Sequence, residues 1–154
     1  MTTAGPVLRH APRIAILLPV ALLLHQAEEW FGGFPEWVLL ATGSGITPQR
    51  FLLINAVGFL LFLVGTLAAF LDSRMAWIVV SLAALVGFNA LLHSVATVVV
   101  GSYSPGTATG LLLNLPLSVA VLRSSAATLP LSGFIGAVVL GVLLHGLATV
   151  TAYG

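Results

Sequence analysis

Residues 76–101 read AWIVVSLAALVGFNALLHSVATVVVG and contain no Asp, Glu, Lys or Arg. An α-helix rises about 1.5 Å per residue, so this stretch is long enough to cross the roughly 30 Å of hydrocarbon in a bilayer. Four other apolar stretches come near the same length. The five expected spans cover residues 14–31, 51–72, 76–101, 107–122 and 129–153. The sequence therefore predicts an all-α, polytopic transmembrane helix bundle that forms one membrane domain over residues 1–154.

The composition agrees with this fold class and excludes several functions. Hydrophobic residues make up 59% of the 154 positions and charged residues only 6%, whereas soluble domains carry charges at about a quarter of their positions. The five basic residues are all arginines and are too scattered to follow a phosphate backbone, which excludes nucleic-acid binding. The chain has no cysteine, so disulfides, thiolate metal sites and a cysteine nucleophile are excluded as well.

The arginines predict how the chain is oriented. With alternating spans, Arg9, Arg13, Arg74 and Arg123 fall on one side of the membrane, and only Arg50 falls on the other. Because cytoplasmic loops are enriched in basic residues, we expect a cytoplasmic N-terminus and an external C-terminus in the plasma membrane. We interpret the first span as a retained signal anchor, since the nearest cleavage position lacks the required small residues.

The longest connection, residues 32–50, carries Pro35, Glu36 and Trp37 and is expected to lie along the membrane interface. At its end, Thr47-Pro48 predicts a helix start, with Thr as the N-cap and Pro in the first turn. The next connections are shorter, and Pro105-Gly106 in the third one is typical of a tight turn.

The first span ends in an unusual polar cluster. Its uninterrupted apolar part, residues 14–24, rises only about 16 Å, which is half a bilayer. The helix must therefore carry His25-Gln26-Ala27-Glu28-Glu29 into or just below the outer headgroup region. Positions three and four apart share a helix face, so His25 can converge with Glu28 and Glu29. Ionisable groups at this depth are costly unless paired, solvated or metal-bound, so the cluster predicts a functional site.

The other spans carry polar side chains at a similar depth. His93 and His145 each lie about 12 Å from the outer ends of their spans, and the side chains of three asparagines, Asn55, Asn89 and Asn114, could join them. Pro116 is expected to kink the fourth span. The inner third of the bundle holds only small hydroxyls such as Thr66, Ser81, Ser118 and Ser132.

His25-Gln26-Ala27-Glu28-Glu29 resembles the signature of the HXXEE-motif family, bacterial and archaeal integral membrane proteins of unknown function. That family's pattern includes a further histidine and a Tyr-x-Pro-Gly motif. Here His93 is the natural match for the histidine, and Tyr103-Ser104-Pro105-Gly106 fits the motif. The resemblance covers about residues 14–122 and implies a membrane protein without an assigned reaction.

The ligand types indicate what chemistry the cluster can support. Imidazole and carboxylate without sulfur suit Zn²⁺ in a catalytic site, or Fe²⁺ and Mn²⁺, and a mononuclear site is favoured because a ferritin-like dimetal site needs more carboxylates. A glutamate outside the ligand set could act as general base or orient a ligand histidine. Tyr103 is expected at the rim of the site. The candidate metal ligands are His25, Glu28, Glu29, His93 and His145, and the candidate catalytic residues are Glu28, Glu29 and Tyr103.

Several alternatives stay open at this point. Glu28 or Glu29 beside a histidine could perform acid–base catalysis without a metal. Either enzyme would act on a lipid-like or apolar small molecule at the outer leaflet, with membrane lipids as its surroundings. A metal-free ligand-binding or assembly subunit is a second class, and an ion or proton transporter, which needs a polar route across the bare inner half, is a third. The simplest interpretations are that the glutamates mark the wet end of a helix, that His93 and His145 make hydrogen bonds between spans, and that Tyr103 is an interfacial anchor.

Overall fold

The computed structural model describes residues 11–153, and Arg9, one of the four arginines used to predict the orientation, lies outside them. The described part is mainly helical and contains no strand, as the sequence predicted. Five of its helical segments are long and apolar enough to cross a membrane. Their ends differ from the expected spans by a few residues. These segments are Arg13–Phe31, Pro48–Leu71, Ser73–Val100, Thr107–Ala126 and Leu131–Tyr153.

The spanning segments combine α-helices with shorter helical turns. A 3₁₀ turn, Arg13–Leu17, precedes the first α-helix, and a second one, Ser73–Met75, precedes the third span. The fourth span begins with one α-helical turn and continues through a π-helical segment, Gly110–Asn114. The α-helices are α1 (Leu18–Phe31), α2 (Phe34–Thr42), α3 (Pro48–Leu71), α4 (Ala76–Val100), α5 (Thr107–Thr109), α6 (Leu115–Ala126) and α7 (Leu131–Tyr153).

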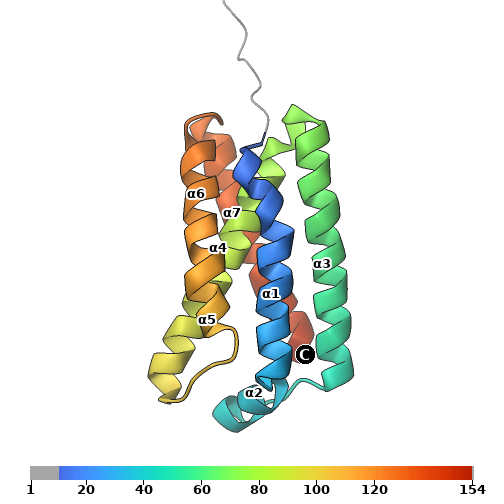
Figure 1. Cartoon of the computed structure of the whole chain (residues 1–154), viewed down its shortest axis with the longest axis vertical. Coiled ribbons are helices and arrows are strands. Elements are labelled where there is room, and N and C mark those ends of the chain that lie inside the picture. Colours follow the sequence, from blue (N-terminus) through green and yellow to red (C-terminus); the bar gives the residue numbers. More distant parts are fainter. Residues whose placement is uncertain (1–10, 154) are drawn as a thin grey trace, which may run out of the picture.

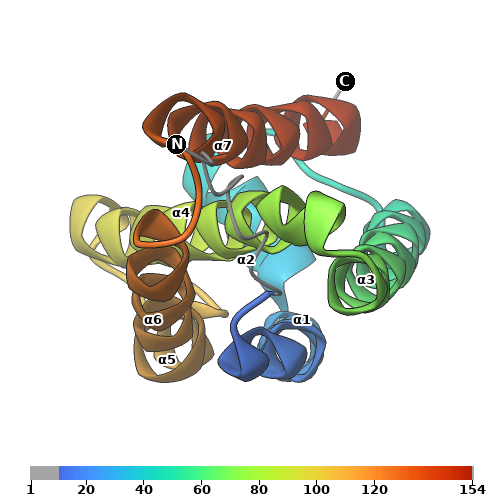
Figure 2. The same cartoon turned by 90° about the horizontal axis from the view of Figure 1, so that it is seen from above.

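Helix α4 is the centre of the bundle. It packs against α3, α6 and α7, and Figure 2 shows it between α7 on one side and α1 on the other. Small residues permit the close approaches: a Cβ on Gly87 would meet the Ser118 hydroxyl of α6, and one on Gly141 would meet the backbone carbonyl of Ser81. The outer faces of α3 and α7 expose many leucines and valines, as expected for helices that face lipid.

The two ends of the bundle differ in polarity. Figure 1 shows that α1, α4 and α7 begin at one end, where α3 and α6 finish. Arg13, Arg74 and Arg123 belong to segments at that end, and Arg50 lies at the start of α3, at the opposite end. This separation matches the two sides assumed in the prediction of orientation.

Two local predictions can be compared with the structure. Thr47 caps α3 as expected, because its hydroxyl accepts the Arg50 N–H at 3.2 Å. The irregularity expected at Pro116 takes the form of the π-helical segment just before it. Proline lacks a backbone N–H and crowds the carbonyl four residues earlier, so the preceding turn widens.

The expected interfacial loop differs in form, because most of it is helical. Pro35 lies in the first turn of α2, where a missing N–H costs nothing, and Gly33 and Gly43 flank the helix with φ values of 73° and 74°. Figure 1 places α2 across the end of the bundle where α1 finishes and α3 begins. The helix therefore covers the part of the bundle that contains His25 and His93.

Candidate metal centre

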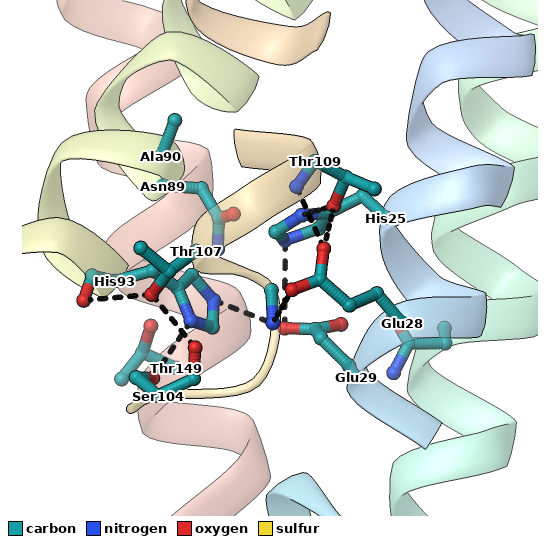
Figure 3. A network of polar contacts seen from close by, with 12 residues as sticks. His25, Glu28, Glu29, Asn89, Ala90, His93, Ser104, Thr107, Thr109 and Thr149 are labelled. Carbon is teal, nitrogen blue, oxygen red and sulfur yellow. Dashed lines mark hydrogen bonds and ion pairs between the residues drawn. The ribbon is translucent and has the colours of Figure 1, made fainter. Parts of the chain in front are cut away.

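Three buried side chains from α1 and α4 converge near the end of the bundle that α2 covers (Figure 3). The Nε2 atom of His93 lies 3.1 Å from Oε1 of Glu29, and the Nε2 atom of His25 lies 3.6 Å from the same oxygen. The two imidazole rings meet edge to face, with 5.0 Å between their centroids. Glu29 is only 6% exposed, and both histidines are less exposed still. The convergence expected of His25, Glu29 and His93 is thus present.

The helix geometry of α1 separates the two glutamates. Successive residues on a helix point about 100° apart, so Glu28 and Glu29 face different neighbours when the helix packs in the bundle. Glu29, four residues after His25, points toward the imidazoles, whereas Glu28, three residues after it, points toward α5 (Figure 3). The pair expected to share one site therefore divides between two sets of contacts.

The Nδ1 atoms of both histidines, which point away from Glu29, contact hydroxyl groups. Nδ1 of His25 lies 3.0 Å from Oγ1 of Thr109, and Nδ1 of His93 lies 3.0 Å from Oγ of Ser104. Each ring is thereby held with its Nε2 atom toward Glu29. This is the arrangement usual for histidine ligands, in which the nitrogen remote from the metal is hydrogen-bonded.

The turn that carries the Tyr-x-Pro-Gly motif packs directly against the two imidazoles. Thr107 donates its N–H to the Ser104 carbonyl at 3.1 Å, which closes the expected turn, and Gly106 supplies the positive φ of 102°. A Cβ on Gly106 would lie 2.8 Å from Cε1 of His25 and 2.9 Å from Cε1 of His93. Pro105 of the same turn packs on Gly32, where a Cβ would lie 2.7 Å away.

Glu28 binds this turn and the start of the fourth span. Its Oε1 accepts the N–H groups of Gly106 at 3.0 Å and Ala108 at 3.1 Å, and its Oε2 accepts the N–H of Thr109 at 2.7 Å. The hydroxyls of Tyr103 and Thr109 also donate to the carboxylate. A carboxylate suits this position, because the first N–H groups of a helix lack partners within it.

Tyr103 lies at the surface beside Glu28, and its ring is half-exposed. Partial burial and the hydrogen bond to Glu28 raise the pKa of Tyr103 above its usual value. The phenol therefore stays protonated at physiological pH and remains a donor to the carboxylate. The hydrogen bond from Tyr103 to Glu28 links the Tyr-x-Pro-Gly motif to the HXXEE motif.

The other expected ligand, His145, stands apart from the three converging side chains. Its Nε2 accepts a hydrogen bond from Nδ2 of Asn89 at 3.1 Å, and its ring meets Phe88 edge to face. Both His145 and Asn89 line a cavity of about 450 Å³ between α2, α4 and α7. Glu29 and His93 form part of the same wall, so the cavity leads to the buried cluster. Its other lining residues are mainly apolar, among them Phe34, Trp37, Val38, Ala41, Leu92, Ala96 and Val100.

The remaining asparagines have different surroundings. Asn55 donates to the Phe51 carbonyl of its own helix at 3.0 Å, and its backbone carbonyl accepts from Gln26 at 3.1 Å, so it ties α3 to α1. Asn114 is fully buried in the π-helical segment, and its carboxamide has no hydrogen-bond partner among residues 11–153. Neither residue contributes to the cavity wall.

Sequence reasoning missed Ser104 and Thr109, the hydroxyls that contact the histidines. Ser104 is the variable position of the Tyr-x-Pro-Gly motif, and Thr109 follows that motif by three residues. Neither is unusual near a membrane surface. Both residues lie in or just after a turn that has to pack near His93, and this position could have indicated them.

The donor set fits a divalent metal. The ligand atoms of His25, Glu29 and His93 all lie within 4.8 Å of one another. A tetrahedral Zn²⁺ with ligand bonds near 2.0–2.1 Å would separate its ligand atoms by roughly 3.4 Å. The measured separations of 3.1 and 3.6 Å fall on either side of that value. Within the described residues, no other group of three such side chains converges in this way.

Fold and site together define a class: a five-span helical bundle with a buried cluster of two histidines and one glutamate at one end, where it could hold a metal ion. The chain belongs to the family of proteins of unknown function with the HXXEE motif, which matches over residues 16–121. The match includes the motif in α1, His93 in α4 and the turn that carries Tyr103. Neither a search of curated proteins nor one of solved structures finds a match.

Proposed function

We propose that His25, Glu29 and His93 bind one divalent transition metal, Zn²⁺, Fe²⁺ or Mn²⁺, and that the protein is a membrane enzyme acting on an apolar or amphipathic small molecule. One observation carries the proposal. Three buried ligand atoms converge, and one of them, Nε2 of His25, has no hydrogen-bond partner in the described part of the chain. A buried polar atom without a partner is costly, and a cation at this point would satisfy it.

The contacts within the cluster favour a bound cation over a direct contact between the side chains alone. Nε2 of His93 lies 3.1 Å from Oε1 of Glu29, within the range of an ion pair. This contact leaves Nε2 of His25 facing the same carboxylate oxygen at 3.6 Å, too far for a hydrogen bond to compensate its burial. A metal among the three atoms would satisfy all of them at once.

Three protein ligands leave coordination positions free for water or substrate, as in catalytic zinc sites. When bound, such a metal polarises a carbonyl or phosphoryl oxygen and lowers the pKa of bound water. The cavity supports access to a free position, because Glu29 and His93 belong to its wall. Asn89 and His145 line the same cavity and are suited to bind a polar group of the substrate.

The cavity also supports the proposed substrate class. Its volume of about 450 Å³ is within the range usual for small-molecule sites, and most of its lining is apolar. Residues of two spanning helices, α4 and α7, line it, so a molecule dissolved in the membrane is a suitable occupant. Membrane lipids are thus the natural surroundings of the substrate.

An enzyme fits better than a transporter. The opposite half of the bundle is packed with apolar side chains, including Leu18, Phe62 and Val79. The buried polar side chains described there are hydroxyls, such as those of Thr66, Ser81 and Ser118. A dry half of this kind provides no polar path through the monomer for an ion or proton.

Metal content is the direct test. The protein is purified without chelator and without a His-tag, and its zinc, iron and manganese are measured by elemental analysis. We expect about one metal per chain in the wild type and at least a 100-fold loss of affinity in His93→Ala and Glu29→Gln, because removal of a ligand exceeds the 10- to 100-fold effect of an outer-shell change.

His145→Ala is the matched control. This histidine lies in the same cavity wall but outside the converging group, so its replacement should leave the metal content unchanged. Wild-type protein that binds none of the three metals would overturn the metal site and leave acid–base catalysis or ligand binding. Equal loss in His145→Ala and His93→Ala would contradict the assignment of ligands.

A further inference from the structure

We infer that the two glutamates of the motif have different functions: Glu29 is a metal ligand, whereas Glu28 acts through Thr109 to hold His25 in the tautomer that presents a bare Nε2 to the metal. Glu28 and Thr109 are thus positioning residues. The role in metal binding rests on the proposed function. The tautomer itself is a property of the metal-free protein and can be tested separately.

Both carboxylate oxygens of Glu28 are hydrogen-bond acceptors. Oε1 accepts backbone N–H groups from Gly106 and Ala108, and Oε2 accepts the N–H of Thr109. A backbone N–H can only donate, and the hydroxyls of Tyr103 and Thr109 donate to the same group, so five donors surround it. Glu28 is therefore a carboxylate, and every hydrogen of its neighbours points toward it.

The hydroxyl of Thr109 has a single proton to donate. That proton is donated to Oε2 of Glu28. The same hydroxyl oxygen lies 3.0 Å from Nδ1 of His25, so in this contact it has to be the acceptor. Nδ1 of His25 consequently carries the hydrogen.

The state of His25 follows. His25 is only 2% exposed, and burial favours the neutral imidazole. A neutral imidazole has one N–H, so Nε2 of His25 carries no hydrogen and presents a lone pair. This atom is buried, lacks a hydrogen-bond partner in the described chain and faces Oε1 of Glu29. Two acceptors that face each other in a buried site form a preorganised position for a cation. Glu28 determines this arrangement through Thr109 and does not itself contact Nε2 of His25.

His93 is not constrained in the same way. Its Nδ1 contacts Ser104, whose hydroxyl can either donate or accept because no carboxylate takes its proton. In the metal-free protein a hydrogen on Nε2 of His93 would face Oε1 of Glu29, 3.1 Å away. We therefore expect the two histidines to have opposite tautomers without metal, and only His93 to change when metal binds.

Nitrogen-15 NMR can test this inference. Protein labelled with ¹⁵N-histidine is prepared in micelles without metal, and the resonances of its four histidines are assigned from single substitutions. The protonated and bare nitrogens of a neutral imidazole have well-separated shifts. We expect His25 to have its hydrogen on Nδ1 in the wild type, a measurement that needs no variant to fold.

Two substitutions of Thr109 then test the relay from Glu28. Thr109→Ser keeps the hydroxyl and should preserve the His25 tautomer and the metal affinity. Thr109→Val keeps the shape but removes the hydroxyl, so we expect a mixture of tautomers and a 10- to 100-fold weaker affinity. A merely structural role for Thr109 would leave the tautomer of His25 unchanged in the valine variant, which would overturn the relay.

The outcomes separate this inference from the proposed function. A hydrogen on Nε2 of His25 in the metal-free wild type overturns the inference, whether or not metal binds. The expected tautomer in a protein that binds no metal supports the relay and rejects the metal. Thr109→Val with unchanged affinity and unchanged tautomer overturns the positioning role alone.

Discussion

At the scale of single residues, the site depends on a glycine as well as on its two histidines and its glutamate. Gly106 is buried, an added Cβ would meet both imidazoles, and its φ of 102° is one that residues with side chains rarely adopt. Its N–H also donates to Glu28. A residue with no side chain thus connects the histidines to the carboxylate that orients His25.

Replacement of this glycine should therefore disrupt the site. We expect Gly106→Ala to lower the free energy of unfolding by about 1–3 kcal/mol, because the added methyl group overlaps both rings and the positive φ is strained. Thermal unfolding in detergent, together with the metal affinity, measures the effect.

Gly101→Ala provides the control for this substitution. Gly101 has a φ of 71°, but nothing lies within 4 Å of an added Cβ. It therefore measures the cost of the backbone strain alone, and it should leave the metal affinity unchanged. Equal effects of both substitutions on affinity would mean that contact with the imidazoles is unimportant.

At the scale of secondary structure, α2 is the element that separates the cavity from the membrane surface. Phe34 stacks on Trp37, with ring centroids 6.0 Å apart, and lies 5.1 Å from the His93 ring. The indole N–H of Trp37 donates to the Ser102 hydroxyl at 3.0 Å. This is a side-chain contact between α2 and the loop that leads into the Tyr-x-Pro-Gly turn.

The Trp37–Ser102 hydrogen bond should stabilise the packing of α2 against the bundle. We expect Trp37→Phe and Ser102→Ala each to lower the free energy of local opening of α2 by about 0.5–1.5 kcal/mol, because each removes one exposed hydrogen bond. The change is measured as faster amide hydrogen exchange in α2. Phenylalanine keeps the stack on Phe34, which isolates the effect of the N–H.

A double-mutant cycle tests whether the two residues act together. Their combined substitution should cost little more than either change alone, since the hydrogen bond can be lost only once. Fully additive effects would show that α2 is held by other contacts, such as those of Val38, which is buried.

At the scale of the whole molecule, the polar site and most of the arginines occupy opposite ends of the bundle. The ends are separated by an apolar core that includes Leu22, Val86 and Val121. The odd number of spans places the two ends of the chain on opposite sides, if all five cross the membrane. The arginine distribution then predicts that the site faces outward.

Reporter fusions test this orientation. Truncated chains joined to a reporter after Ser73, Ser104 or Gly154 should show the Ser73 fusion in the cytoplasm and the other two outside, because basic residues flank the cytoplasmic ends. A fusion after Asp72 should behave as the one after Ser73. A cytoplasmic reporter after Gly154 would contradict five spans with an internal N-terminus.

The sequence by itself determined the fold class and the depth of the polar residues. Apolar length identifies a spanning helix, because every backbone group has to be bonded within the segment in hydrocarbon. Counting residues along those helices brought His25 and His93 to a common level, and the turn at Pro105-Gly106 follows from proline and glycine geometry. These features depend on local chemistry alone.

The tertiary structure decided which groups face one another. Residues three and four apart both lie near His25, and only the packing of α1 against α4 and α5 directs Glu29 to the histidines and Glu28 to the turn. The partners Ser104 and Thr109 are ordinary residues until that packing brings them to 3.0 Å from an imidazole nitrogen. A helix specifies the spacing of its side chains but not its rotation against its neighbours, which depends on the close fit of the whole bundle.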